Sequence, residues 1–516
     1  MSVSEDAKLR LLCANDVYKP EQFSIFKSMK EEYNGVGVTK SILSGDFLGG
    51  SLFATLSKGE SMIRVCNSVG FDYVVIGNHE FDFGDDRLKE LMDMGEYPWL
   101  GSNVRLASSE LQENKVSETT LSRVLFHKRV LDIDIFDCGT YRVGVFGVCT
   151  ASTPNLSSPS PNVVFESELE HAQRATKLLQ ERGCDVILAL THVSIAVDKA
   201  IAAIDGINMI IGGHDHDPFL LFENGTLIIK CGQNIEHLGV IDLDIFTDTS
   251  TGQVQVRHSF QLVSTHGHTG HPEVNAVIDQ FNEHHSTDGE EPVQLSRVFD
   301  GAIVPTGGAD SDIVNNLYAP FSTRSADVRT RESASVCLVA DAMLYSYTQI
   351  GYQCDFGFLN GGFVRGDRLY PPGCPILKSD VLNELPFQRE PVLISIRGSD
   401  LWLGLEQMLA GAPRPVGSFP HMSAHFQGTF DLKKKPLSRI QAISIRGQPI
   451  DLNKEYSVVI SDFYASKEGD GVEAFANKPV IHNHGRTISS VVCEYLTTVD
   501  SVKGYPPGRF FDQPVE

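Results

Sequence analysis

The chain has 516 residues, of which 41% are hydrophobic and 21% charged. This length exceeds the size at which a single hydrophobic core stops growing, so two or more domains are expected. A net charge of -23 argues against non-specific binding to nucleic acid or to an anionic membrane. A phosphate-binding site in so acidic a chain needs local positive charge, and metal ions can supply it.

The N-terminal sequence MSVSEDAKLRLLCAND has no apolar stretch of signal-peptide length, and no run of ~18 apolar residues occurs along the chain. The ten cysteines are scattered without a C-x-x-C pair, which is typical of reduced thiols rather than of a disulfide framework. We therefore expect a cytoplasmic protein with no membrane-spanning segment. The sequence does not indicate an oligomeric state.

The first half of the chain alternates short apolar runs with longer amphipathic segments, a pattern that predicts β-α-β units. The predicted strands are Leu9–Ala14, Ser41–Leu43, Tyr73–Ile76, Val143–Val148, Val186–Leu190 and Met209–Ile211. Apolar residues recur every three or four positions in Leu52–Ser68 and Glu166–Arg182, which predicts helices there.

The composition changes near Ser264, where a polar, glycine-containing stretch with one amphipathic segment begins. Such a stretch is typical of a linker. We therefore predict an α/β domain over residues 1–264, a linker with a connecting helix over 265–292, and a second α/β domain over 293–516.

Five of the apolar runs end in side chains that can bind metal. The residues at these ends are Asn15-Asp16, Ser44-Gly45-Asp46, Gly77-Asn78-His79-Glu80-Phe81-Asp82, Thr191-His192 and Gly212-Gly213-His214-Asp215-His216. In open α/β sheets, sites assemble beyond the carboxyl ends of the strands. We therefore expect these five strand ends to converge on one site.

Asp, Asn and His ligands without Cys suit divalent ions such as Zn, Mn, Fe or Co. A carboxylate can bridge two ions held ~3.5–4 Å apart, and such a pair activates water against a phosphate ester. His79 and Asp82 are three residues apart and can pair, so that the imidazole protonates a leaving oxygen or stabilises the transition state.

These residues resemble the calcineurin-like metallophosphoesterase superfamily, in particular its two-domain 5′-nucleotidase branch, over nearly the whole chain. The segment GNHEFDFG, Gly77–Gly84, is the most specific part of the resemblance. The resemblance implies an αββα-type sandwich as the catalytic domain and an α/β domain that binds substrate. It also implies two metal ions and a catalytic pair, His79 and Asp82. The implied metal ligands are Asp16, Asp46, Asn78, His192, His214 and His216.

One residue departs from the family pattern. The family motif D-x-H reads Asp16-Val17-Tyr18 here, so a tyrosine stands in place of a histidine ligand. Tyr18 either binds an ion as a phenolate, which suits Fe(III), or points away and leaves the first ion weakly bound or absent.

The second half extends the resemblance to substrate binding. Asn360 and Arg365, in LNGGFVR, match the family's N-G-G-G-I-R segment, and Arg331 matches a second arginine of that site. Phe419 and Tyr464 match the two rings that sandwich the base. Asp470, in EGDG, matches the aspartate of G-G-D-G, with Glu468 in place of the first glycine.

The sequence therefore predicts a metal-dependent phosphohydrolase that converts nucleoside 5′-monophosphates to nucleoside and phosphate, as in nucleotide catabolism. Two alternatives stay open at this point. One is a phosphodiesterase or general phosphomonoesterase with the same fold. The other is a nucleotide-binding protein whose metal site has degenerated through Tyr18.

Overall fold

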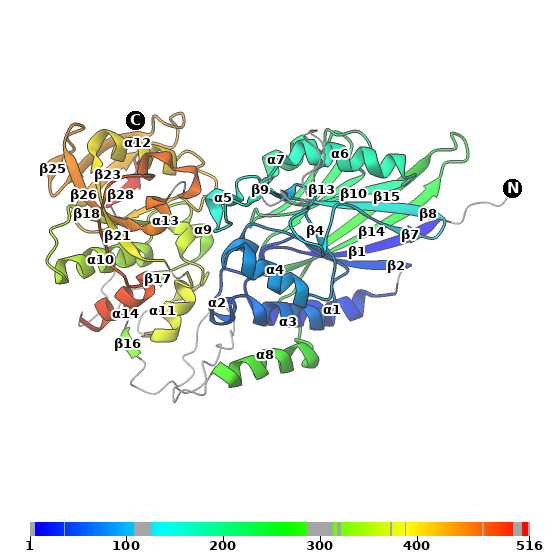
Figure 1. The fold of residues 1–516 in the computed structure, drawn as a ribbon, viewed down its shortest axis with the longest axis horizontal. Helices are drawn as coiled ribbons and strands as arrows, with labels where there is room; N and C mark the ends of the chain where they lie inside the picture. The colour runs from blue at the N-terminus through cyan, green and yellow to red at the C-terminus, as the bar shows by residue number, and fades with distance from the viewer. Residues whose placement is uncertain are drawn as a thin grey trace. The chain divides into compact units, whose positions relative to one another are not determined.

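The computed structural model describes residues 6–35, 37–107, 125–285, 313–316, 321–371, 374–387, 389–466, 469–498 and 508–513. The chain divides into two compact units, Met1–His285 (unit 1) and Ser286–Glu516 (unit 2). Figure 1 shows sheets with helices on their faces in both units.

Unit 1 contains two mixed β-sheets, and the strands that precede the candidate ligands run parallel within each. The seven-stranded sheet has the order β15 (Val254–Ser264), β14 (His237–Thr247), β1 (Ala7–Ala14), β2 (Val38–Leu43), β3 (Tyr73–Val75), β4 (Trp99–Leu100) and β6 (Val130–Leu131). The six-stranded sheet has the order β12 (Pro218–Glu223), β13 (Thr226–Cys231), β11 (Met209–Gly213), β10 (Val186–His192), β8 (Tyr141–Cys149) and β7 (Asp134–Cys138).

The two sheets pack face to face through one hydrophobic cluster. This cluster joins Leu9, Ile42 and Val75 of the first sheet to Leu188 and Ile211 of the second. Helices cover the two outer faces: α1 (Pro20–Tyr33), α3 (Glu60–Val69) and α4 (Asp85–Met94) lie over the first sheet, and α6 (Glu168–Glu181) and α7 (Ile195–Ile201) over the second. The predicted αββα sandwich is confirmed, and burial on both faces explains the continuous apolar runs.

The six predicted strands and the helix predicted over Glu166–Arg182 are confirmed within a few residues. The helix predicted over Leu52–Ser68 is wrong in its continuity. The segment forms α2 (Leu52–Ser57) and α3, separated at Lys58 and Gly59, whose φ angles of 49° and 86° are left-handed. Lys58 is the left-handed C-cap of α2, and Gly59, which adopts this conformation at little cost, precedes α3.

A helix forms where the sequence predicts a connecting helix, but it belongs to unit 1. This helix, α8 (Pro272–His285), buries Val274 and Ile278 in the cluster that contains α1 and α3. The ring of Phe281 lies 4.4 Å from that of Phe53. The part of the predicted linker that follows α8, residues 286–292, lies outside the described residues.

Unit 2 is built on a five-stranded sheet with the order β22 (Pro420–Met422), β18 (Phe356–Asn360), β26 (Glu455–Ser461), β21 (Pro391–Arg397) and β27 (Val480–Asn483). One face packs on α10 (Ala334–Gln349), α11 (Lys378–Glu384) and α14 (Ile488–Thr498). The other packs on α12 (Gly398–Met408) and a second sheet, ordered β25 (Gln448–Pro449), β24 (Ile440–Ile445), β23 (Phe426–Phe430) and β28 (Phe510–Asp512).

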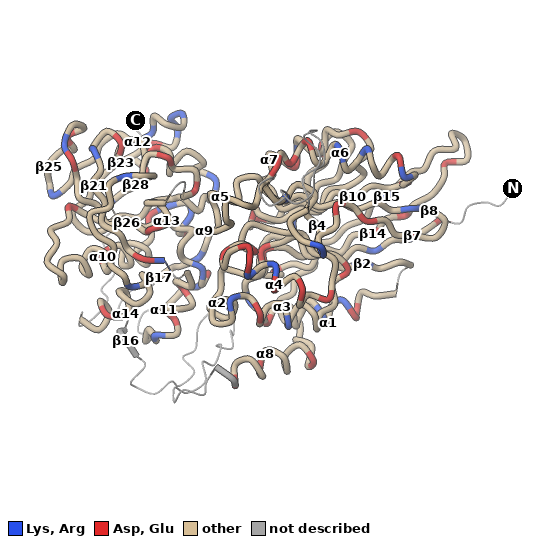
Figure 2. The backbone as a smooth tube through the Cα atoms, viewed as in Figure 1, with Lys and Arg blue, Asp and Glu red and all other residues tan. Residues whose placement is uncertain are grey.

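The described residues also form three two-stranded sheets. Two-stranded sheets pair β5 (Val104–Leu106) with β9 (Val163–Phe165), β16 (Ile313–Asn316) with β20 (Pro375–Leu377), and β17 (Phe321–Ser322) with β19 (Leu369–Tyr370). Figure 2 shows acidic and basic residues interspersed along both units. Among the helices that the structure describes, none has the length and hydropathy needed to cross a membrane.

Candidate metal centre

The candidate ligands of unit 1 come together at the carboxyl ends of strands from both sheets. Asp16 and Asp46 follow β1 and β2, and the Asp16 N–H donates to the Gly45 carbonyl at 3.0 Å. His192 ends β10, and His214 follows β11. The site therefore draws on the edges of two stacked sheets, where the sequence alone suggests a single sheet edge.

Three candidate ligands have left-handed backbone conformations. The φ angles are 54° at Asp16, 58° at Asp46 and 77° at His214. Residues with a Cβ seldom adopt such angles, and they persist where the surrounding structure holds them, often at functional sites. The strained turns after β1, β2 and β11 therefore support a function for this edge.

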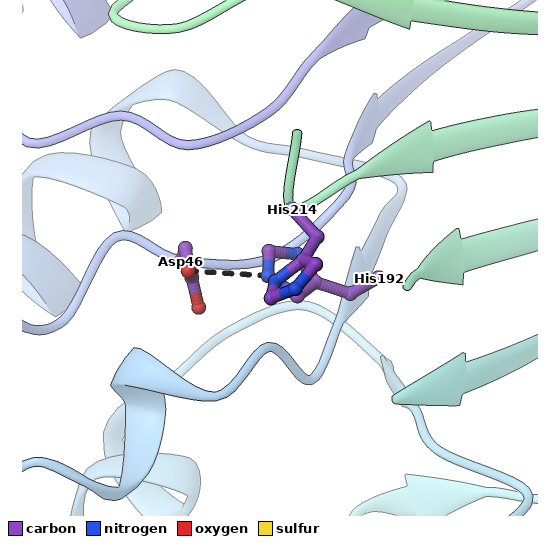
Figure 3. Close-up of side chains that lie close together, drawn as sticks. All are labelled: Asp46, His192 and His214. Atoms are coloured by element: carbon purple, nitrogen blue, oxygen red, sulfur yellow. Dashed lines mark ion pairs between the residues drawn. The ribbon is translucent and has the colours of Figure 1, made fainter. Parts of the chain in front are cut away.

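The buried Asp46 and His192 and the half-buried His214 form a cluster (Figure 3), and their ligand atoms all lie within 4.8 Å of one another. His192 Nε2 lies 3.1 Å from Asp46 Oδ2, but the two atoms lack hydrogen-bond geometry. His192 Nδ1 lies 2.7 Å from the Ser44 carbonyl oxygen. With Nδ1 directed at that carbonyl, Nε2 is the ring nitrogen that faces Asp46 and that could bind a metal ion.

Asn78 and Asp16 adjoin this cluster. Asn78 Oδ1 lies 3.1 Å from His214 Nδ1, and the His214 N–H donates to Asp16 Oδ2 at 2.8 Å. The His79 N–H donates to Asp46 Oδ1 at 2.8 Å. The strand ends predicted to converge therefore do so, and their oxygen and imidazole donors fit divalent ions.

Tyr18 points into the site. Its hydroxyl lies 3.1 Å from His216 Nε2 and 3.5 Å from Asp16 Oδ1, and His216 Nε2 lies 3.4 Å from the same Asp16 oxygen. The alternative in which Tyr18 points away is wrong.

The charges in the cluster depend on one another. Burial raises the pKa of the Asp46 carboxyl, but the positive charges of His192 and His79 outweigh burial and hold it well below its usual value. Burial lowers the pKa of His192, but the negative charges of Asp46 and Asp16 prevail and raise it to about 10. The acidic side chains thus create a strong preference for positive charge at this edge.

His79 and Asp82 form the predicted pair. His79 Nδ1 lies 2.9 Å from Asp82 Oδ2, and the Ser157 hydroxyl donates to Asp82 Oδ1 at 2.7 Å. With Nδ1 held by the carboxylate, Nε2 is the nitrogen that can exchange a proton with a substrate oxygen.

In unit 2, three of the predicted substrate-binding residues form one hydrogen-bonded group. Asp470 Oδ2 accepts from the Tyr464 hydroxyl at 2.6 Å and from Asn360 Nδ2 at 3.3 Å. Asn360 Nδ2 also donates to the Gly417 carbonyl at 2.9 Å. Asn360 ends β18 and is buried, and its hydrogen bond to Asp470 brings the turn after β18 against the turn at Asp470.

The structure contradicts the prediction that Phe419 and Tyr464 stack on a base. Both side chains are fully buried in one hydrophobic cluster. Phe419 packs edge-on against Phe430, and Tyr464 packs against Phe475. A ring covered on both faces cannot stack on a base, and the apolar character of the two residues is explained by packing.

The predicted arginines are placed differently from each other. Arg331 lies in the turn between α9 (Ser325–Val328) and α10, and its exposed guanidinium pairs with Asp327. The Arg365 guanidinium lies over the Phe387 ring, 5.2 Å from its centroid. Glu468, the departure in EGDG, lies outside the described residues.

Comparison with known proteins identifies the domain family of each unit. The family model of calcineurin-like phosphoesterases matches residues 9–218, and that of the 5′-nucleotidase C-terminal domain matches residues 311–477. The chain belongs to the two-domain 5′-nucleotidase family. It is therefore a metal-dependent hydrolase of phosphoric esters, and its calcineurin-like domain implies divalent metal ions.

Similar proteins agree with this family. The chain is 23% identical to the 5′-nucleotidase of Mus musculus over 90% of this chain and 80% of that protein. It is 26% identical to a trifunctional nucleotide phosphoesterase protein of Bacillus subtilis over 88% of this chain, but spans only 31% of that protein's length.

Among solved structures, the fold is similar to a 5′-nucleotidase precursor from Thermus thermophilus, with a TM-score of 0.79 and 20% identity over 98% of this chain and 99% of that one. It is also similar to a sulfate thiohydrolase from Thermus thermophilus, with a TM-score of 0.71 and 19% identity over 96% of this chain and 83% of that one. Identities this low show the shared fold alone.

Two further residues of this 5′-nucleotidase-family chain hold the candidate ligands in place. Neither was assigned a role from the sequence. The first is Glu80, whose carboxylate accepts from the backbone N–H groups of Gly77, Asp46 and Phe47 at 2.5, 3.0 and 2.9 Å. Burial, together with the negative charge of Asp46, raises the pKa of Glu80 to about 7. Its position in the GNHE motif marks Glu80 as a candidate in the sequence, but only the folded structure shows that it holds the Asp46 turn.

The second is Lys230, a fully buried cation behind the histidines. Its ammonium donates to the carbonyls of Val193 and Gly213 at 2.5 and 2.8 Å, next to His192 and His214. It pairs with Asp198 at 2.8 Å and Asp215 at 2.7 Å. Lys230 therefore ties the ends of β10 and β11 together. A lone lysine within an apolar strand, LIIKC, is a sequence signal, but the pattern does not identify its partners.

Replacing Lys230 tests whether it holds the ends of β10 and β11 together. In Lys230→Met, the Asp198 and Asp215 carboxylates lose their buried cation, a change that typically costs ~3–5 kcal/mol. We expect a matching loss in the free energy of unfolding in urea, together with weaker binding of Mn. The exposed Lys199, 3.9 Å from Glu223, is the control, and Lys199→Met should change stability little. Equal stability of the two variants would contradict the role of Lys230.

Replacing Glu80 tests the support of Asp46. Glu80→Gln turns an amide NH₂ toward backbone donors, so at least one buried N–H loses its acceptor, at ~1–3 kcal/mol. We expect lower stability and a several-fold weaker affinity for Mn, measured by calorimetry. Glu60→Gln, at a helix surface beside Arg64, is the control. Unchanged Mn affinity in Glu80→Gln would show that the Asp46 turn holds its shape without this carboxylate.

Proposed function

We propose that the chain hydrolyses nucleoside 5′-monophosphates to nucleoside and phosphate at a centre of two metal ions in unit 1. The observation that carries the proposal is the cluster of Asp46, His192 and His214, which Asn78 and Asp16 adjoin. Five polar strand ends from two sheets meet there, which a purely structural role does not require.

Within this site we assign a role to each group of residues. Asn78, His192 and His214 would hold one ion and Asp16 and His216 the other, with the Asp46 carboxylate available to both. When bound, Zn, Mn, Fe or Co ions activate water and neutralise the phosphoryl oxygens. His79, oriented by Asp82, donates a proton to the leaving oxygen or a hydrogen bond to the phosphoryl group.

For the nucleotide, we propose recognition by Asn360, Arg365 and Asp470 of unit 2, with Arg331 as a further phosphate or ribose contact. The names of the relatives, 5′-nucleotidase and nucleotide phosphoesterase, support nucleotides as the substrate class. The burial of Phe419 and Tyr464 favours a second candidate, a phosphomonoesterase with little selectivity for the base.

We also propose a cytoplasmic location. All ten cysteines are unpaired and most are buried, and unpaired thiols are usual where glutathione and thioredoxin keep them reduced.

Phosphate release tests the function and separates the candidates. With Mn, Zn, Co or Fe supplied, we expect the fastest release from nucleoside 5′-monophosphates and slow release from cyclic nucleotides. Equal release from sugar phosphates would favour the general phosphomonoesterase. Release from no ester with any metal would contradict a hydrolase and favour a nucleotide-binding protein.

Replacing His79 tests the proposed proton donor. His79→Ala should lower kcat by ~10²–10⁴-fold, the usual contribution of a positioned acid or base, with little change in bound metal. The exposed His266 is a matched control, and His266→Ala should leave kcat unchanged. A kcat for His79→Ala within a factor of two of the unaltered protein would exclude this role.

A further inference from the structure

A single buried glutamate of unit 2 holds the segment that carries Arg365. Glu384 is the last residue of α11 and is 9% exposed. Its backbone carbonyl accepts from the Arg365 N–H at 3.0 Å, and its Oε2 accepts from the Gly366 N–H at 3.0 Å. Two consecutive backbone donors therefore end on one residue, which fixes the path of the chain at Arg365.

The Glu384 carboxylate is itself held from its other side. Its Oε1 accepts from the Tyr370 hydroxyl at 2.6 Å and from the Thr323 hydroxyl at 3.1 Å. Three donors thus meet the two oxygens, so the buried carboxylate is satisfied in one orientation. A Cβ at Gly366 would collide with this carboxylate. The close approach of the two segments therefore depends on glycine at that position.

The residues after Glu384 also support the Arg365 side chain. The guanidinium lies over the Phe387 ring, 5.2 Å from its centroid. The Phe387 ring in turn packs edge-on against Phe363, with the centroids 5.5 Å apart. Cation–π attraction restricts where a long, flexible side chain can lie. The segment from Glu384 to Phe387 thus contacts Arg365 at both its backbone and its guanidinium.

We propose that Glu384 is a positioning residue for nucleotide binding, because it fixes the backbone at Arg365 and thereby the guanidinium that meets the phosphate or ribose of a nucleoside 5′-monophosphate. Glu384 touches no substrate and acts through Arg365. This inference rests on the proposed nucleotide-binding role of Arg365 and adds to it a buried residue of a different segment.

Glu384→Gln tests the proposal in the full chain supplied with manganese. Glutamine keeps the shape of the side chain, but its single amide oxygen cannot serve all three donors. We expect KM for adenosine 5′-monophosphate to rise ~tenfold, as for a weakened contact to a charged group. The value of kcat should stay nearly constant, because the metal centre lies in unit 1. Gly366→Ala disturbs the same contact from the opposite side and should raise KM likewise.

A second buried glutamate of unit 2 provides a matched control. Glu406 is 3% exposed and accepts from the backbone N–H groups of Arg439 and Ile440 at 3.0 and 2.7 Å. Glu406→Gln should therefore lower the free energy of unfolding much as Glu384→Gln does, but leave KM unchanged.

Combination with Arg365→Ala separates positioning from a general structural role. In that background Glu384→Gln should raise KM no further, because both changes act through one guanidinium. An unchanged KM in Glu384→Gln and Gly366→Ala, or the same increase with and without Arg365, would overturn the proposal. Phosphate release from the nucleotide would then still support the hydrolase. If no ester is cleaved, the same comparisons made with Kd from calorimetry decide the role of Glu384, so the two failures are distinguishable.

Discussion

Burial of the Asp46 carboxylate is the constraint on which the site depends. Asp46 is 2% exposed, and a buried carboxylate is costly unless cations and donors surround it. Its Oδ1 accepts from the His79 N–H at 2.8 Å, and its Oδ2 lies 3.1 Å from His192 Nε2. This single side chain thus joins the turn after β3 of one sheet to the end of β10 of the other.

Two buried charged residues each hold one half of the site in place. Glu80 binds the backbone of the Asp46 turn, and Lys230 binds the ends of β10 and β11. Neither is placed as a ligand. Because their partners include backbone groups of the Asp46 turn and of the ends of β10 and β11, they hold these segments in place. The strained turns at Asp16, Asp46 and His214 can persist because such contacts surround them.

Much of unit 1 was predictable because local patterns carry the information. Apolar runs that end in Asp16, Asp46 and His192 predict both the strands and the ligands. The division into two stacked sheets came from the family resemblance and not from local patterns, since strand pairing depends on contacts distant in sequence. The break at Gly59 and the burial of Phe419 and Tyr464 were likewise missed. The sequence does not distinguish a glycine that interrupts a helix from one that lies within it. It also does not distinguish an aromatic residue that packs in the core from one that binds a base.

The central claim is that these strand ends surround two cations bridged by Asp46, and a manganese-soaked crystal measures this most directly. Anomalous scattering should give two peaks ~3.5–4 Å apart on either side of the Asp46 carboxylate. One peak should lie beside His192 and His214, and the other beside Asp16 and His216. A single peak, or peaks remote from Asp46, would contradict the account.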